Sequence, residues 1–349
     1  MTSEEKQSHT TREDHIWVKD IQEDDQVRGL YAAKTKRLAR TKRGDPFLSI
    51  TLSDRTGDME CRVWDNAEAL SSLFKEGDIL DIEGRANSYR NQVQLIIADL
   101  KVADNGADPS LFLEATSYDA KDMIRSLREV LKTIKEPHLK KLMESFLSDR
   151  AFMTLFKEAP AAKNFHHGYV GGLLEHTLSV CRLTDSVCEH YPQLDRDLLL
   201  AGAFLHDIGK IKEFKTHTLI EYTDEGRLLG HLVLGAAMLD EKLDHIKSFP
   251  RDTALRLKHL ILSHHGEYDF GSPKRPKFLE AFVLHFIDDL DAKVSGLGRF
   301  MERDTQEGVW TDFNRMFDRY LLKGKILEVE EETFPSSDVD DRQELLFKP

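Results

Sequence analysis

Residues 198–210 read LLLAGAFLHDIGK, and they contain the strongest structural signal of the chain. The first eight of these residues are all apolar or glycine, which predicts a helix that is buried on every side. His206 and Asp207 follow directly, and Gly209 allows the chain to turn away. Because an unpaired buried polar group costs about 1–3 kcal/mol, an imidazole and a carboxylate at the end of such a helix predict a functional centre.

Side chains of the same types occur inside or at the ends of other apolar stretches between residues 160 and 300. They are His176, His231, the pair His264-His265, and Asp288. Imidazoles and carboxylates that converge from several helices form transition-metal sites, and this ligand set suits manganese, iron, cobalt or zinc. The alternative is a set of unrelated structural histidines, since the chain contains fifteen. Their common placement favours a metal site.

The order of a histidine, a His-Asp pair and a distant aspartate resembles the HD superfamily of metal-dependent phosphohydrolases. The similarity covers about residues 160–300, and LHDIGK at 205–210 is similar to the central motif of that family. The resemblance implies a helical domain with one or two divalent ions, with manganese as the first expectation and cobalt, iron or zinc as alternatives. It assigns to the first ion His176, His206, Asp207 and Asp288, and to a second His231, His264 and His265, with the choice between the last two left open.

The resemblance also implies catalytic roles. Two ions bridged by Asp207 would activate a water for attack on phosphorus. Lys210, one helical turn after His206, is expected to contact a phosphate oxygen, and the alternative is a solvated lysine near a helix C-terminus, where the helix dipole favours it. His167 is expected to contact the scissile phosphate or to protonate a leaving oxygen, and a capping or core role is the alternative.

The segment from 27 to 102 has the alternating pattern of short β-strands. Turn residues at 44–46, 54–57 and 87–91 separate these strands, and a short helix fits residues 66–75. Five strands are expected near 27–36, 47–53, 58–65, 79–88 and 92–101. This order of strands and helix is that of an OB-fold barrel. We therefore expect a multi-domain protein in which an all-β OB-fold barrel is followed by an all-α helical bundle.

Basic and aromatic residues of the expected barrel indicate a surface for single-stranded nucleic acid. Residues 34–43 contain six bases and no acid, and they fall on the end of the first strand and the loop after it. Arg62 and Trp64 alternate with the apolar Met59, Cys61 and Val63, so an arginine and a ring that can stack on bases share the outer face. The alternatives are a solvated loop, and a Trp64 ring packed under the following helix. The expected contacts are Lys34, Lys36, Arg37, Arg40, Lys42, Arg43, Arg62, Trp64, Arg85, Tyr89 and Arg90.

Three further segments make the family resemblance more specific. NFHHGYVGGLLEHT at 164–177, YTDEG at 222–226 and LSHHG at 262–266 are similar to the YhaM-type 3′→5′ exoribonucleases, which join an N-terminal OB-fold to a C-terminal HD domain. The resemblance implies a hydrolase that shortens single-stranded RNA, or DNA, to nucleoside 5′-monophosphates. One alternative is an HD-type phosphodiesterase of cyclic nucleotides or dinucleotides, but GEYDFGSP at 266–273 lacks the Gly-Tyr-Pro signature of the dinucleotide enzymes. A non-catalytic nucleic-acid-binding adaptor with a structural metal is the other.

Composition sets the remaining expectations. Lys and Arg number 49 against 62 Asp and Glu, and the net charge of −13 argues against nonspecific coating of nucleic acid or of a membrane. No apolar run approaches the ~20 residues of a membrane span, and residues 1–15 lack a secretory signal, so we expect a cytoplasmic protein. A homo-oligomer is compatible with the sequence.

After residue 110 the pattern is helical to about residue 325. The expected organisation is a polar segment at 1–25, the OB-fold at 26–103, a linker and helical connection at 104–159, the HD domain at 160–325 and an acidic tail at 326–349.

Overall fold

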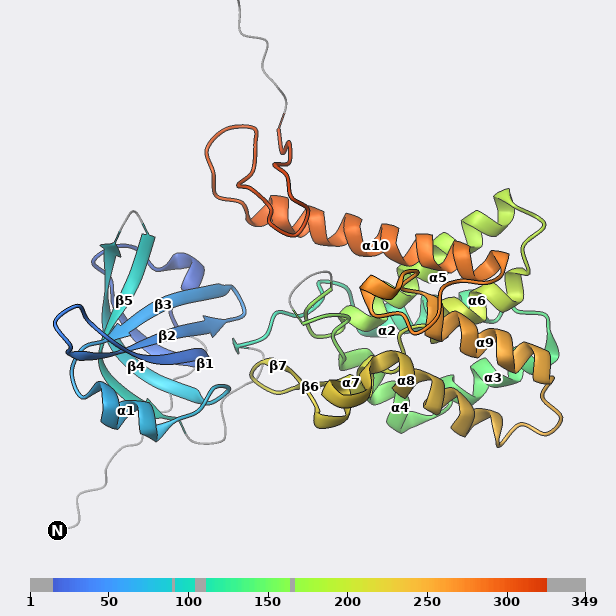
Figure 1. Ribbon diagram of the computed structural model, residues 1–349, viewed down its shortest axis with the longest axis horizontal. Coiled ribbons are helices and arrows are strands. Elements are labelled where there is room, and N and C mark those ends of the chain that lie inside the picture. Colours follow the sequence, from blue (N-terminus) through green and yellow to red (C-terminus); the bar gives the residue numbers. More distant parts are fainter. Residues whose placement is uncertain (1–14, 90–91, 104–110, 164–166, 325–349) are drawn as a thin grey trace, which may run out of the picture. The chain divides into compact units, whose positions relative to one another are not determined.

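The computed structural model describes residues 15–89, 92–103, 111–163 and 167–324. By its internal contacts the chain divides into two compact units, Met1–Gly296 and Leu297–Pro349. Figure 1 shows that the N-terminal part of the first unit consists mainly of strands and that the rest of it consists mainly of helices. The fold class expected from the sequence, a β-barrel followed by a helical bundle, is therefore confirmed. The acidic tail expected at 326–349 lies outside the described residues.

The barrel is built from five strands. They are β1 Gln26–Arg40, β2 Pro46–Asp54, β3 Gly57–Val63, β4 Ile79–Tyr89 and β5 Gln92–Val102. They close in the order β1-β2-β3-β5-β4, with β3 and β5 parallel and the other neighbours antiparallel. Helix α1, Ala67–Leu73, joins β3 to β4. Met59, Cys61 and Val63 are buried in the barrel core, as their alternation along the strand predicts.

Strand β1 is longer than its polar composition suggests. It pairs with β2 as far as Arg40, which lies opposite Pro46, so Lys34 to Arg40 belong to a strand and only Lys42 and Arg43 lie in the turn. Gly44 adopts a φ of +95° in this turn, and its N–H donates to the carbonyl of Thr41. The expectation that the first strand ends near residue 36 was wrong, because backbone pairing with β2 extends the strand through solvent-exposed basic residues.

The helical part shares one hydrophobic core, which runs from Met123 to Ile287. Its helices are α2 Ala120–Leu131, α3 Pro137–Leu147, α4 Arg150–Glu158, α5 Gly172–His190, α6 Arg196–Leu205, α7 Lys210–Glu213, α8 Asp224–Leu243, α9 Arg251–Ser263 and α10 Leu279–Arg303. All eight residues from Leu198 to Leu205 are buried, so α6 runs through the middle of this core. The chain leaves the core directly at His206, and this fixes where the imidazole and the next carboxylate lie.

Two parts of the helical region differ from the sequence-based expectation. Helix α10 ends at Arg303, and residues 304–324 form bends with short antiparallel bridges such as Trp310 to Leu322, so the expectation of helix to about residue 325 was wrong. A small hairpin of β6, Phe214–Thr216, and β7, Ile220–Tyr222, follows α7. Among the described residues, no helix combines the length and apolarity needed to cross a membrane.

Candidate metal centre

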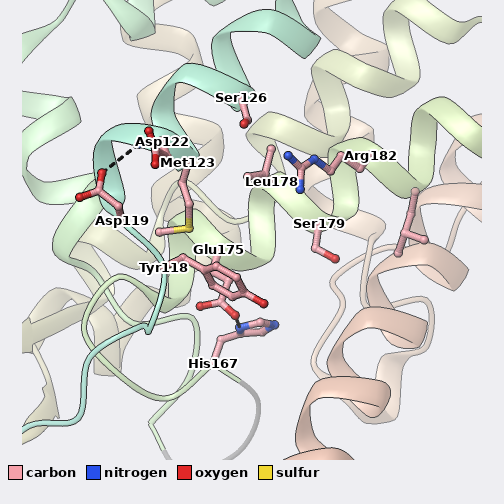
Figure 2. A pocket seen from close by; sticks show the side chains of 11 residues that line it. Tyr118, Asp119, Asp122, Met123, Ser126, His167, Glu175, Leu178, Ser179 and Arg182 are labelled. Carbon is pink, nitrogen blue, oxygen red and sulfur yellow. Dashed lines mark hydrogen bonds and ion pairs between the residues drawn. The ribbon is translucent and has the colours of Figure 1, made fainter.

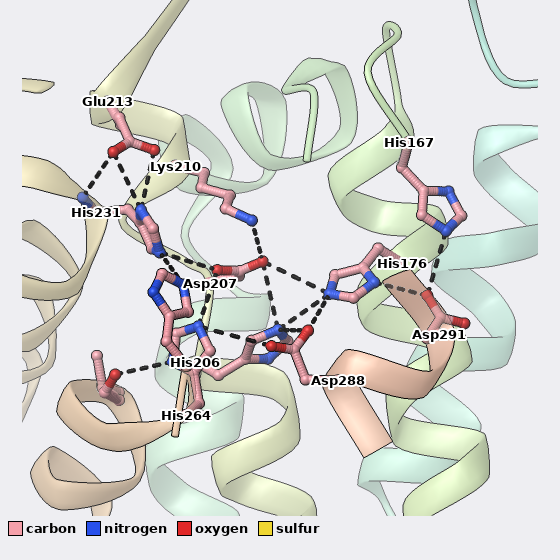
Figure 3. Close-up of polar contacts among 12 residues, drawn as sticks. His167, His176, His206, Asp207, Lys210, Glu213, His231, His264, Asp288 and Asp291 are labelled. Carbon is pink, nitrogen blue, oxygen red and sulfur yellow. Dashed lines mark hydrogen bonds and ion pairs between the residues drawn. The ribbon is translucent and has the colours of Figure 1, made fainter. Parts of the chain in front are cut away.

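Five elements of the helical bundle bring histidine and aspartate side chains to one point (Figure 3). Helix α5 contributes His176, the end of α6 contributes His206 and Asp207, α8 contributes His231, the end of α9 contributes His264 and His265, and α10 contributes Asp288. Gly230 has a φ of +71° and breaks the regular geometry of α8 just before His231. All seven metal ligands expected from the sequence therefore lie in one cluster.

The first half of the cluster surrounds one carboxylate oxygen of Asp207. Oδ2 of Asp207 lies 3.6 Å from Nε2 of His176 and 3.4 Å from Nε2 of His206. Oδ1 of Asp288 lies 3.1 Å and 3.7 Å from the same two nitrogen atoms. Two imidazole nitrogens and two carboxylate oxygens thus lie close together, and all four side chains are buried or nearly buried.

The second half surrounds the other oxygen of the same carboxylate. Oδ1 of Asp207 lies 3.5 Å from Nε2 of His231 and 3.5 Å from Nε2 of His264. Nε2 of His265 lies 3.2 Å from Nε2 of His231. Oδ1 is buried and makes no hydrogen bond with any described residue. One carboxylate therefore faces two separate sets of ring nitrogens, one with each oxygen.

Hydrogen bonds on the outer side of the rings fix which nitrogen carries the proton. In every case Nδ1 faces an oxygen that can only accept, which requires an Nδ1–H donor. These bonds are His176 to Asp291 Oδ2 at 2.7 Å, His206 to Ala203 O at 2.8 Å, His231 to Glu213 Oε1 at 3.1 Å, His264 to Ile261 O at 2.9 Å and His265 to Phe270 O at 2.9 Å. In a neutral ring the inner Nε2 then carries only a lone pair.

This arrangement fits divalent cations. Nε2 atoms of His176 and His206 lie 3.1 Å apart, and two lone pairs at that distance repel unless a cation or a proton lies between them. The unbonded Oδ1 of Asp207 is a second buried atom that lacks a positive partner. Imidazole nitrogens with carboxylate oxygens are the ligand set of manganese, iron, cobalt and zinc rather than of calcium. The residues present therefore fit one or two transition-metal ions.

Two carboxylates outside the ligand set were missed from the sequence. Asp291 accepts from His176, and Glu213 accepts both the ring N–H and, at 3.0 Å, the backbone N–H of His231. Carboxylates in this position orient a ligating ring and make it more basic. Asp291 could have been found, because it lies three residues after Asp288 and therefore on the same face of the helix. Glu213 carried no such signal, since it comes from a separate short helix.

The electrostatics of the cluster favour neutral rings beside ionised carboxylates in its second half. Burial lowers the pKa of His265 to about 3, together with repulsion from the neighbouring His264 and His231. Burial also lowers the pKa of His264. For Asp207 burial opposes ionisation, but the positive charge of Lys210 and the His206 ring hold its pKa well below the usual range. The ring lone pairs and the carboxylate charge are thus available to a cation.

Lys210 and His167 occupy different positions relative to this centre. Nζ of Lys210 lies 2.5 Å from Oδ2 of Asp207, and the lysine side chain is buried rather than solvated. His167 lies on the far side of His176 from Asp207 (Figure 3), where its Nε2 is 3.2 Å from Asp291 Oδ2 and its Nδ1 is 2.9 Å from the Tyr169 hydroxyl. His167 therefore supports the carboxylate that holds His176 and does not face the ligand atoms directly.

The basic residues of the barrel fall into paired and unpaired groups. Lys34 forms an ion pair with Asp58, Arg85 with Asp24, and Arg40 with Glu68. Lys36 donates to the Ser71 carbonyl at the end of α1, and Arg62 donates to Ser49 and pairs with Glu60. The side chains of Arg37, Lys42 and Arg43 are exposed and make no hydrogen bond or ion pair with other described residues. Arg90 lies outside the described residues.

Two aromatic rings of the barrel are exposed. The Trp64 side chain is 49% exposed, and its ring lies 5.2 Å from that of Phe47 between centroids. It packs against this strand residue instead of being covered by the following helix, so it presents one face to solvent. Tyr89, at the end of β4, is 57% exposed. Exposed aromatic rings are the side chains on which bases stack in proteins that bind single-stranded nucleic acid.

Comparison with known proteins gives the same two-part organisation. The family model described as HD domain matches residues 173–293, and the one described as OB-fold nucleic acid binding domain matches residues 17–103. A 3′-5′ exoribonuclease YhaM of Bacillus velezensis is 33% identical over 82% of this chain and 91% of its own. The protein of the same name from Bacillus subtilis is 33% identical over 81% of this chain and 89% of its own, and one from a Geobacillus species is 32% identical over 86% and 93%.

Proposed function

The chain belongs to the YhaM family of 3′-5′ exoribonucleases, and we propose that it degrades single-stranded RNA from the 3′ end at the cluster around Asp207. It is a metal-dependent hydrolase of single-stranded nucleic acid with an OB-fold and an HD domain. The observation that carries the proposal for the site is the position of Asp207, whose two oxygens face two separate sets of histidine nitrogens.

We assign the ligands of the two ions from this division. The first ion would be held by His176, His206, Asp207 and Asp288, and the second by Asp207, His231, His264 and His265. Manganese is the ion that we propose, with cobalt, iron and zinc compatible with the same donors. A pair of such ions supplies a nucleophilic hydroxide at neutral pH and neutralises charge on the phosphate that is attacked.

The protein itself contributes position and charge around these ligands. Asp291 and Glu213 accept the Nδ1–H of His176 and His231, which turns the Nε2 atoms of these rings toward the proposed ions. Lys210 neutralises Asp207 in the metal-free protein, and we propose that its ammonium group moves to a non-bridging phosphate oxygen when substrate binds, because both groups are anions within reach of one flexible side chain. His167 acts through Asp291 as a positioning residue. The products are nucleoside 5′-monophosphates and an RNA shortened by one residue.

The barrel supplies contacts to the strand upstream of the cleaved bond. Trp64 offers an exposed stacking face, and the unpaired Arg37, Lys42 and Arg43 offer charge to phosphates. RNA is the substrate that we propose first, since the curated relatives are named exoribonucleases.

Cys61, Cys181 and Cys188 are free and buried. Free cysteines are usual in proteins of the reducing cytosol, and we propose that location for this protein.

The test uses single-stranded RNA labelled at either end. With manganese, RNA labelled at the 5′ end should give a ladder of shortening strands, and RNA labelled at the 3′ end should release labelled mononucleotide at once. Asp207→Asn and His206→Ala should lose the activity, whereas His190→Ala, an exposed histidine on α5, should retain it. Cleavage of a cyclic dinucleotide with no shortening of either RNA would contradict the proposal, and so would full activity of Asp207→Asn.

A further inference from the structure

Helix α10 has a second apolar row in addition to the one that it buries. Five large apolar residues at the three- and four-residue spacing of one helix face are 47–64% exposed. They are Leu279, Phe282, Phe286, Leu290 and Val294, and we call this row the α10 stripe. Another face of the same helix is buried in the core of the bundle through Leu284 and Ile287. A helix that already has a buried face needs no second apolar row for its own fold, so the α10 stripe indicates a partner.

The bridged segment at residues 304–324 is a hairpin that holds polar groups inside and presents apolar groups to solvent. Thr311 and Asn314 are buried, and Oδ1 of Asn314 accepts two backbone N–H groups of the turn. Five large apolar side chains of the hairpin are 42–66% exposed. They are Trp310, Phe313, Met316, Tyr320 and Leu322. The 304–324 hairpin is therefore a second exposed apolar surface, and its own hydrogen bonds define its shape.

The composition of these two surfaces favours a protein partner over a nucleic acid. Half of the ten exposed side chains are aliphatic or, in Met316, a thioether, and these have no ring on which a base can stack. The 304–324 hairpin contains four acids and three bases, so it offers no excess of positive charge to phosphates.

The surfaces also differ from a small-molecule site, which is a recess. Such a recess, of about 460 Å³, lies between α2 and α5 with Met123 and Leu178 in its wall (Figure 2). No residue of the α10 stripe or of the 304–324 hairpin lines it. A row of apolar side chains on an exposed helix face instead matches the same kind of row on another helix.

We propose that the α10 stripe and the 304–324 hairpin form the interface of a symmetric homodimer, in which the α10 helices of two copies pack antiparallel. In such a pair the same surface of both copies meets itself, so an apolar row meets an apolar row. At about 200 Å² for a large side chain, ten that are about half exposed offer on the order of 1,000 Å² per chain. A stable interface buries about 800 Å² on each partner. The α10 stripe alone has about half of this area, so the interface needs the hairpin as well.

Charges beside the α10 stripe specify the direction of the pairing. The helix runs from Leu279 to Arg303, so its midpoint is residue 291, and Asp289 and Lys293 stand two residues before and after it. Both side chains are partly exposed. In an antiparallel pair centred on the midpoint, Asp289 of each copy lies opposite Lys293 of the other, which gives two reciprocal ion pairs. A parallel pair would place like charges opposite each other, which is unfavourable.

The same register interlocks the apolar residues. Leu290 lies opposite residue 292 of the second copy, between its Leu290 and its Val294, as a knob lies in a hole of a helix pair. Arg303 lies opposite Leu279 of the second copy. Because the 304–324 hairpin starts one residue after Arg303, it emerges beside the first turn of the other α10.

Mass in solution is the first readout, and it requires neither metal nor substrate. Analytical ultracentrifugation at micromolar concentration should give twice the mass of one chain. Phe286→Glu places a charge in the middle of the α10 stripe and should weaken the dimer about a hundredfold, as loss of a central interface residue does. Leu255→Glu, on an equally exposed residue of α9, should leave the dimer unchanged. Circular dichroism and thermal melting check that each variant is folded. A monomeric wild type, or a dimer that Phe286→Glu does not weaken, would overturn the proposal.

The part of the hairpin is tested in the same way. Tyr320→Glu should weaken the dimer about tenfold, whereas Tyr191→Glu, on an exposed ring just after α5, should not. A Tyr320→Glu variant with wild-type affinity would remove the hairpin from the interface. If the masses of the Phe286→Glu and Tyr320→Glu variants are unaltered but they bind single-stranded RNA more weakly than the wild type, the surface contacts nucleic acid and the proposal is wrong.

Exchange of charges tests the ion pairs. Asp289→Lys and Lys293→Asp each make the two facing positions alike in charge, so each should weaken the homodimer about tenfold. An equal mixture of these two variants should form the heterodimer, because every lysine then faces an aspartate. The double variant Asp289→Lys/Lys293→Asp should dimerise like the wild type. Homodimers of both single variants as stable as the wild type would contradict the pairing of these residues.

Cross-linking tests the direction. A short bismaleimide should join two copies of Leu290→Cys, because residue 290 lies next to the midpoint of the pair. It should not join two copies of Phe282→Cys, which an antiparallel pair separates by 18 residues, about 27 Å along the axis. Cys61, Cys181 and Cys188 are buried, so the added cysteine is the one that reacts. Equal cross-linking of the two variants would mean a parallel pair and would overturn the proposed arrangement.

Discussion

Nδ1 of His176 lies 2.7 Å from Oδ2 of Asp291, and both side chains are almost completely removed from solvent. The same carboxylate accepts from Ser179 and contacts His167, so one aspartate fixes the orientation of a ligand ring from behind. Hydrogen bonds to Asp291 lower its pKa although burial opposes its ionisation, which keeps it an acceptor at neutral pH.

Loss of this carboxylate should weaken metal binding. Asp291→Asn removes the charge that holds the His176 ring, and changes of this type cost about 10–100-fold in metal affinity. Titration with Mn²⁺ by calorimetry or electron paramagnetic resonance measures the effect directly. Asp289→Asn is the matched control, because Asp289 is partly exposed and pairs with Lys293. An affinity for Mn²⁺ equal to that of the wild type would show that Asp291 has no such role.

Lys210 should contribute most to the free energy of unfolding when no metal is bound. Its ammonium group is the cation 2.5 Å from the buried Asp207, and removal of one partner of a buried pair costs about 3 kcal/mol or more of unfolding free energy. Lys210→Met should therefore be destabilised in the metal-free state and regain most of the loss with Mn²⁺, since a bound cation replaces the lost charge. Urea unfolding with and without Mn²⁺ tests this, with the exposed Lys212→Met as control. A loss of the same size in both states would contradict the explanation.

The barrel should show a pH-dependent contribution from Asp54. Burial opposes its ionisation, but hydrogen bonds from His15, Thr56 and the Val18 backbone outweigh this and lower its pKa. A carboxyl whose pKa is lower in the folded state stabilises above its unfolded pKa, near 4, and loses that contribution as the pH falls toward the folded pKa.

Asp54→Asn should thus be destabilised by about 1–3 kcal/mol at pH 7 and by progressively less below pH 4. Urea unfolding at a series of pH values, followed by tryptophan fluorescence, gives the difference. Asp58→Asn, whose side chain is exposed and paired with Lys34, should show a small difference at every pH. A constant difference between pH 7 and pH 3 for Asp54→Asn would mean that its charge is not involved.

The unpaired bases of β1 and its turn should set the salt dependence of RNA binding. Each phosphate contact to a single strand adds about 0.7 to the slope of log K against log salt, so replacing Arg37, Lys42 and Arg43 by Gln should reduce that slope by about 2. Fluorescence anisotropy with the inactive His206→Ala background avoids degradation of the probe. Arg28→Gln with Lys101→Gln is the control, because both bases are paired with carboxylates. An unchanged slope would remove this surface from the binding site.

Gly266 should be needed for the second half of the metal site. Its φ is +81°, and a Cβ there would lie 2.3 Å from the ring of His285, which itself donates to the His264 carbonyl. Gly266→Ala should therefore displace His264 and His265 and weaken the binding of the second Mn²⁺ about tenfold. Gly271→Ala separates this clash from backbone strain, because Gly271 has a φ of +85° but open space around it. Equal effects of the two changes would assign the result to strain alone.

The sequence predicts the metal centre well because polar, ionisable side chains stand there in stretches whose apolar neighbours predict burial. An aspartate at the end of a fully apolar helix, as at Asp207, has few structural explanations, so its type and place are informative. Glu213 supports the same site but looks like an ordinary surface acid in the sequence, since only the fold brings it against His231, whereas the spacing of Asp291 from Asp288 already indicates a shared helix face. The length of strand β1 was underestimated because three of the five residues from Lys36 to Arg40 are basic, whereas the strand is extended there by backbone pairing with β2.

The proposed ligands are spread along the chain from His176 to Asp288, and they come from five elements packed on one core. The set of proposed ligands is complete only when the whole segment from α5 to α10 is present. During synthesis the N-terminal barrel emerges first and can fold while the rest is still unmade. The metal centre is therefore complete only when α10, which carries Asp288, has been made and packed on the helices that precede it.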